Sequence, residues 1–67
     1  MKKQELVTVL LKTEKSHEEV NVLVDQYLKL LVEEGEDITD IDIPDIEPEH
    51  VLAIVESHVF IHNLLKR

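Results

Sequence analysis

The chain contains three stretches in which apolar residues recur with a helical period, separated by polar segments. The first stretch runs from Lys3 to Glu14, and one broad side of its helical wheel is apolar while Glu5, Thr8 and Lys12 lie on the other side. We therefore expect a first helix over about residues 3–14. Its apolar side consists of Leu6, Val7, Val9, Leu10 and Leu11.

The second stretch carries the clearest helical signal. Ser16 and Glu19 match a capping box, in which each side chain accepts a hydrogen bond from the backbone N–H of the other residue. Gly35 supplies the left-handed residue that commonly follows a helix. We expect a helix from His17 to about Glu34. Its apolar positions follow the spacing i, i+3, i+4, i+7, i+8, i+11 and are Val20, Leu23, Val24, Tyr27, Leu28 and Leu31.

The third stretch begins at Pro48, which suits the first turn of a helix, and runs to about Leu65, with Glu47 or the residue before it as the expected cap. Its apolar residues lie on two faces, and a helix of this kind is normally covered on both sides. We therefore expect a homodimer formed through this helix. The wider face holds Val51, Leu52, Ile54, Val55, Val59, Ile61 and Leu65, and the narrower face holds Ala53, Phe60 and Leu64.

Residues 37–48 interrupt the helical pattern, because Pro44 and Pro48 exclude a continuous helix. Residues 41–43 fit a short edge strand whose isoleucines face the helical body while the intervening acids face outward. The predicted fold class is therefore a single all-α domain over residues 1–67. It has three helices and an extended acidic segment between the second helix and the third.

Charge is distributed very unevenly along the chain. The 67 residues include 15 Asp and Glu against 7 Lys and Arg, which gives a net charge of −8. Nine of the acids and none of the bases lie from Glu33 to Glu49, so this segment carries −9 and the remainder about +1. A generally acidic surface would spread its acids over all helices, so the segment needs its own explanation. The shortage of Lys and Arg argues against direct binding of nucleic acid.

Size and composition narrow the class of protein further. The absence of Cys excludes a disulfide-stapled scaffold and a Cys-ligated zinc module. The longest apolar run, residues 51–55, is too short to span a bilayer, and the first residues lack a signal-peptide core. We expect a cytoplasmic protein without membrane association. A domain of about 60 residues buries only about 60% of its surface, which also favours self-association.

Two histidines, His58 and His62, have the i, i+4 spacing that can place two imidazoles on one metal ion. Both lie within the wider apolar face, and no Cys or His-Glu-x-x-His motif accompanies them. We expect a packed pair that is hydrogen-bonded to the backbone or to a partner chain. The alternatives are a pH-sensitive pair at an interface and a metal site.

Catalytic motifs have little support in this sequence. The single Gly leaves no phosphate-binding loop, and the acidic segment has Asp45 where a calcium loop requires Gly. We therefore expect no enzymatic activity, cofactor or metal.

The acidic segment has three interpretations: solvation, docking on a basic surface of a protein, and mimicry of a nucleic-acid backbone inside a nucleic-acid-binding protein. We favour a small non-enzymatic binding protein of the inhibitor, antirepressor or adaptor type. The alternative is a structural subunit that self-associates through its helices while the segment only solvates it. The expected partner-binding residues are Glu36, Asp37, Asp40, Asp42, Asp45 and Glu47.

Overall fold

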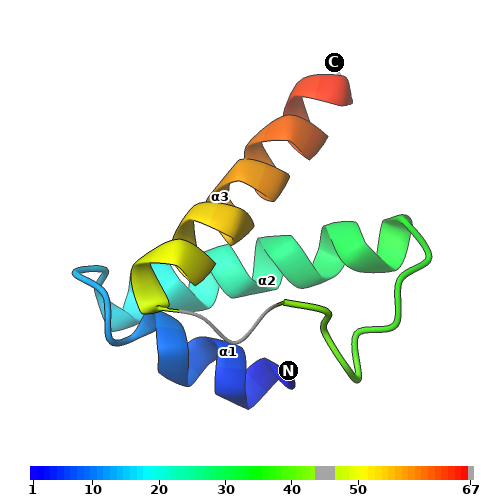
Figure 1. The fold of residues 1–67 in the computed structure, drawn as a ribbon. Coiled ribbons are helices and arrows are strands. Elements are labelled where there is room, and N and C mark those ends of the chain that lie inside the picture. Colours follow the sequence, from blue (N-terminus) through cyan, green and yellow to red (C-terminus); the bar gives the residue numbers. More distant parts are fainter. Residues whose placement is uncertain (44–46, 67) are drawn as a thin grey trace.

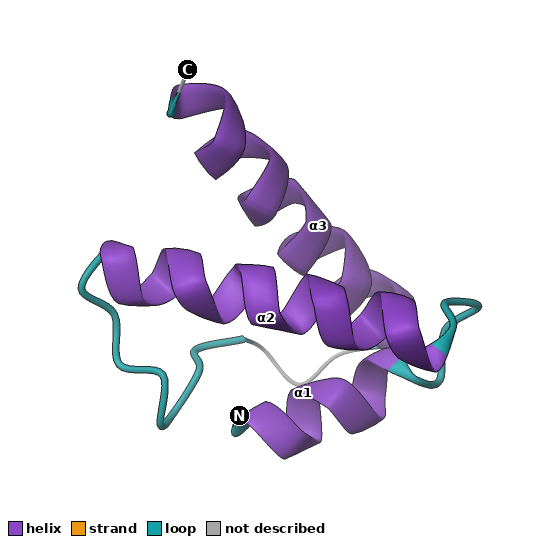
Figure 2. Ribbon diagram, turned by 180° about the vertical axis from the view of Figure 1, so that it is seen from behind, coloured by secondary structure: helices purple, strands orange, loops and turns teal. Residues whose placement is uncertain are grey.

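The computed structural model describes residues 1–43 and 47–66, and this part of the chain forms three helices. They are α1 (Lys3–Leu10), α2 (His17–Glu33) and α3 (Pro48–Leu65). Each helix packs against the other two, and Figure 1 and the reverse view in Figure 2 show the three around a common centre. The predicted all-helical class with three helices is confirmed.

The strand suggested for residues 41–43 is absent from the described residues. The backbone N–H of Ile41 donates to the Met1 carbonyl at 2.7 Å, and the N–H of Ile43 donates to the Ile41 carbonyl at 3.0 Å. The second of these is a local turn within the segment. These two hydrogen bonds do not form the repeated inter-strand ladder that a paired β-strand would need.

Helix α1 ends four residues earlier than the sequence pattern predicts, at Leu10. The Thr13 hydroxyl donates to the Leu10 carbonyl at 2.6 Å, and the Thr13 backbone N–H donates to the same carbonyl at 3.1 Å. The Thr13 hydroxyl also accepts from the N–H of Lys15. A threonine side chain that bonds to nearby backbone in this way competes with helix continuation. The chain therefore turns here and enters α2.

Both ends of α2 form as the sequence predicts, with its last residue at Glu33 rather than Glu34. At the start, the Glu19 N–H donates to the Ser16 hydroxyl at 3.2 Å, and the Ser16 N–H donates to the Glu19 carboxylate at 3.4 Å. At the end, Gly35 has φ +80° and its N–H donates to the Val32 carbonyl. The next N–H donates five residues back, to the carbonyl of residue 31, which completes a Schellman motif.

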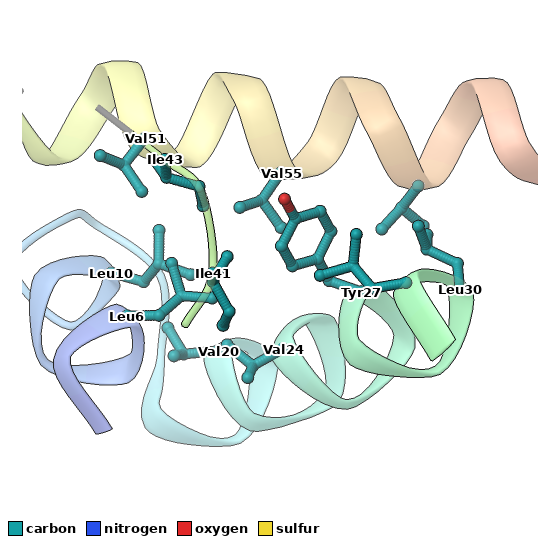
Figure 3. Packing of buried hydrophobic residues seen from close by; sticks show 12 residues of the cluster. Leu6, Leu10, Val20, Val24, Tyr27, Leu30, Ile41, Ile43, Val51 and Val55 are labelled. Atoms are coloured by element: carbon teal, nitrogen blue, oxygen red, sulfur yellow. The ribbon is translucent and has the colours of Figure 1, made fainter. Parts of the chain in front are cut away.

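Helices α2 and α3 run in roughly the same direction (Figures 1 and 3). The chain must therefore return from the C-terminal end of α2 to the N-terminal end before α3 begins. Residues 34–43, here called the acidic loop, make the described part of this return. Ile41 is 2% exposed and Ile43 is also buried, whereas Ile38 is 37% exposed. The acidic loop is therefore anchored in the core by two isoleucines.

A continuous extended course of the acidic segment is not confirmed. The backbone N–H and the hydroxyl of Thr39 donate to Asp37 Oδ1 at 2.9 and 2.6 Å, so the loop makes a turn at Asp37. Residues 44–46 of the predicted segment lie outside the described residues.

The core draws on all three helices and the acidic loop (Figure 3). It includes Leu30, which the predicted apolar face of α2 missed, while Leu23 and Leu28 are only half-buried. The wider face of α3 is buried only in part, because Ile61 and Leu65 are exposed. The buried residues are Leu6, Leu10, Val20, Val24, Tyr27, Leu30, Leu31, Ile41, Ile43, Val51, Val55 and Val59.

Replacing Ile41 by alanine tests how the acidic loop is anchored, with Ile38→Ala as the matched control on the same loop. Because Ile41 is almost fully buried, we expect Ile41→Ala to lower the free energy of unfolding by about 2 to 5 kcal/mol. We expect Ile38→Ala, at a partly exposed position, to cost about 1 kcal/mol or less. Urea unfolding followed by circular dichroism measures both. Equal losses would show that Ile41 is not the anchor.

Candidate functional site

Two histidines of α3 contact the two acids that end α2. Nε2 of His58 lies 3.0 Å from Glu34 Oε1, and Nε2 of His62 lies 2.9 Å from Glu33 Oε2. One helical turn further on, Nζ of Lys66 donates to Glu33 Oε1 at 3.0 Å. Residues 58, 62 and 66 follow at i, i+4 and i+8, so one stripe of α3 faces the last turn of α2. We call these five residues the His–Glu cluster.

The histidine pair is thus half-buried, and the predicted hydrogen bonds to the backbone are replaced by bonds to side chains. The histidines bond to carboxylates of the same chain rather than to the backbone, because the end of α2 lies against this stripe of α3. The His58 ring also meets the Tyr27 ring edge-on, with centroids 5.6 Å apart and planes at 78°. The described residues contain no group of three or more His or acidic side chains arranged to hold a metal ion.

Electrostatics within the His–Glu cluster favour the ionised form of Glu33. Hydrogen bonds from Lys66, and next from His62, hold the pKa of this exposed carboxyl below its usual range. The macrodipole disfavours acids at a helix C-terminus, and the Lys66 ammonium of α3 offsets that effect. The cluster therefore joins the C-terminal part of α3 to the end of α2.

The acidic loop presents four of the predicted partner-binding residues, all of them exposed. Glu36 and Asp42 form no ion pair with any described residue. Asp37 caps the turn, and hydrogen bonds from the Thr39 hydroxyl and N–H lower its pKa. Asp40 accepts from the Met1 ammonium at 3.0 Å. Two of the four carboxylates therefore hold the loop in shape, and the other two are open to a ligand.

The remaining two predicted residues fall elsewhere. Glu47 is exposed and takes the N-cap position of α3, but its side chain makes no capping hydrogen bond. Asp45 lies outside the described residues. The structure therefore gathers the acids of residues 36–42 and does not bring Glu47 to them.

These four acids line a single cavity of about 290 Å³ between the acidic loop and helices α2 and α3, which we call the acidic pocket. Its apolar lining comes from one residue each of α2, the loop and α3, and its anionic rim comes mainly from the loop. The pocket thus combines a negative rim with an apolar floor. Its described lining is Tyr27, Leu31, Glu34, Glu36, Asp37, Asp40, Ile41, Asp42, Ile54 and His58.

Tyr27 is the residue of this pocket that the sequence pattern assigned only to the core. Its side chain is 4% exposed, and Figure 3 shows its hydroxyl end pointing away from α2 toward α3. Burial, and then the charges of Glu34, Glu36 and Asp42, raise the pKa of the phenol. The hydroxyl therefore stays protonated and lies within the field of the carboxylates.

The chain has no match among known protein families, curated proteins or solved structures in the comparisons made.

Within the described residues, none of the three helices combines the length and the hydropathy that crossing a bilayer would require.

Acid titration of stability tests the His–Glu cluster. The lowered pKa of Glu33 adds stability that is present above the ordinary glutamate pKa of about 4.3 and is lost as the pH falls through the lower folded value. We expect Glu33→Gln to be less stable than the wild type near neutral pH, and the two to converge on acidification. Urea midpoints at a series of pH values measure this.

The control variant is Glu14→Gln, since Glu14 is exposed and lies between α1 and α2. It should keep the acid sensitivity of the wild type. A constant difference between Glu33→Gln and the wild type at all pH values would contradict the role given to the Glu33 carboxylate.

Proposed function

We propose that this protein is a non-enzymatic cytoplasmic binding protein that docks its acidic loop on a basic surface of another protein. The observation that carries this proposal is the division of the loop between buried isoleucines and exposed acids. Ile41 and Ile43 fix the loop in the core while Glu36 and Asp42 remain exposed. A charged loop that is already ordered loses less conformational entropy on binding than a flexible one.

The uneven charge of the chain supports the same function. The segment from Glu33 to Glu49 carries −9 and the rest of the chain about +1, so the field of the protein is concentrated on one region. Such a field orients a basic partner during encounter and raises the association rate. It also discriminates against acidic partners, including nucleic acid itself.

Docking on a basic protein surface is favoured over mimicry of a nucleic-acid backbone. A mimic needs a dense row of charges, because each strand of B-DNA presents one charge every 3.4 Å or so of helix axis. The acids of residues 36–42 reach that density only with help from Glu33 and Glu34. Both of these acids are held by cationic or imidazole groups of α3. The inhibitor or adaptor type of binding is therefore the better-supported proposal.

Capture of partners from a cell lysate tests the docking function. The loop variant carries Glu36→Gln, Asp37→Asn and Asp42→Asn, which leaves the Asp40 contact with Met1 in place. At low salt, about 50 mM, we expect the wild type to capture basic proteins that the loop variant loses, because the attraction is weakly screened there. Quantitative mass spectrometry of the captured proteins is the measurement.

A charge-matched control separates the loop from overall acidity. This control carries Glu5→Gln, Glu14→Gln and Glu18→Gln. It should capture the same proteins as the wild type, and capture by both should decline when salt is raised. If the loop variant captured the same proteins as the wild type, docking through the acidic loop would be wrong.

A second candidate function is a structural subunit that self-associates through α3, with the acidic loop only solvating it. The observation that favours it is a group of large apolar side chains left exposed near the end of α3. A single chain of this size leaves such side chains uncovered, and a second copy would bury them. The group consists of Phe60 at 67%, Ile61 at 53%, Leu64 at 54% and Leu65 at 79% exposure.

Light scattering coupled to size exclusion tests this assembly. At micromolar concentration we expect about twice the 7.8 kDa mass of one chain for the wild type. The double variant Phe60→Ser/Leu64→Ser should give the mass of one chain, because it removes apolar area from the contact. Val22→Ser, at an exposed apolar position of α2, serves as the control and should leave the dimer intact. A wild-type monomer would rule out the α3 interface.

A further inference from the structure

The acidic pocket contains one buried polar group that the described part of the fold leaves without a hydrogen-bond partner. The Tyr27 side chain is more than nine-tenths buried, and its hydroxyl makes no hydrogen bond with a described residue. No polar side-chain atom among the described residues is both sealed from solvent and unpaired. The hydroxyl therefore keeps some contact with solvent, and the acidic pocket is a cavity that Tyr27 lines. A buried phenol in this position favours a ligand that completes its hydrogen bonding.

The charges around this hydroxyl are mostly negative. The carboxylates of Glu34, Glu36 and Asp42 act directly on the phenol and oppose its ionisation. His58 lines the same pocket, the Met1 ammonium contacts a carboxylate of its rim, and both groups are already engaged. The imidazole of His58 bonds to Glu34, and the Met1 ammonium bonds to Asp40. Carboxylate oxygens of the rim therefore remain free to accept hydrogen bonds from a cation.

The floor of the pocket is apolar. Leu31 of α2, Ile41 of the acidic loop and Ile54 of α3 contribute to its lining. A ligand that fits both parts has an apolar stem and a cationic head with several hydrogen-bond donors. Lysine and arginine side chains have this composition, since their methylene groups pack on apolar surface while the charged end reaches polar groups.

We propose that the acidic pocket receives one arginine side chain of the basic protein partner, so this site rests on the docking function proposed above. The stem packs on Leu31, Ile41 and Ile54. The guanidinium donates to the Tyr27 oxygen and to carboxylates of the rim, among which Asp42 and Glu36 carry no other described ion pair.

A guanidinium suits this pocket better than an ammonium for two reasons. It is weakly hydrated, so less hydration is lost when it enters a partly buried site. Its five N–H donors spread in one plane and reach acceptors that lie in different directions, here the phenol oxygen and the carboxylates of the loop. The compact ammonium of lysine makes fewer of these contacts at once.

Titration of the full chain with short blocked peptides tests the arginine site. The probes are three five-residue peptides of Gly and Ser around one central residue, which is arginine, lysine or citrulline. Citrulline has nearly the shape of arginine but no charge. We expect saturable shifts of the backbone amide signals of Leu31, Ile41 and Ile54 in nuclear magnetic resonance spectra. A single side chain should bind with a Kd on the order of 1 mM.

The expected order of affinity is arginine, then lysine, then citrulline, with about tenfold between the first and the last because only charge-assisted hydrogen bonds are lost. Equal binding of lysine and arginine would overturn the guanidinium assignment. Equal binding of citrulline would overturn the cation site.

Two variants locate the contact, and a third controls for charge. Tyr27→Phe keeps the ring and removes the hydroxyl. It should lower the affinity for the arginine peptide about fivefold. Asp42→Asn should do the same at an exposed position where the fold is not at risk. Glu14→Gln removes one charge outside the pocket and should leave the affinity unchanged. Equal weakening by all three variants, or shifts spread over every acidic surface without saturation, would overturn the site.

The peptide titration and the lysate capture can fail independently, so they distinguish the arginine site from the docking function. If the peptides fail to bind in the pocket while the loop variant still loses its basic partners in the lysate capture, docking stands and the arginine site is wrong. If the peptide binds in the pocket but the loop variant captures the same proteins as the wild type, the site stands and docking through the loop is wrong.

Discussion

The shared starting end of α2 and α3, which then run obliquely in the same general direction, is the constraint on which the rest of this structure depends. Two neighbouring helices that run the same way require the chain to travel back along the body between them. The chain makes this return in the segment that holds most of its excess negative charge. Like charges repel one another in such a segment, so burial of Ile41 and Ile43 must hold it on the helices. The acids are therefore displayed at fixed positions on the surface.

Local signals in the sequence were sufficient for the existence of the three helices, for both ends of α2 and for the start of α3. The capping box at Ser16, the Gly35 stop and Pro48 each act within one turn of the backbone, so their effects can be read from neighbouring residues. The early end of α1 depends instead on the hydrogen bond that the Thr13 hydroxyl donates to the Leu10 carbonyl. The burial of Leu30 depends on where α3 lies, which no local pattern specifies.

The candidate site was predictable in its charge but not in its shape. The nine acids from Glu33 to Glu49, with no Lys or Arg among them, indicated a charged segment. Their partners, His58 and His62, became apparent only from the relative position of α2 and α3. Tyr27 has the spacing of a core residue. It also lines the acidic pocket, because the acidic loop passes beside it.

The direction of α3 also has a consequence for the order of assembly. Only six residues, 11–16, join α1 to α2, whereas fourteen residues, 34–47, must close before α3 can pack on α2. Contacts of short sequence separation form at a lower entropic cost and usually form earlier. The pair of α1 and α2 is thus the natural nucleus, and α3 closes the structure. Because the acidic pocket has walls from α2, the loop and α3, it comes into being only with the last helix, and a partly folded chain would not display it.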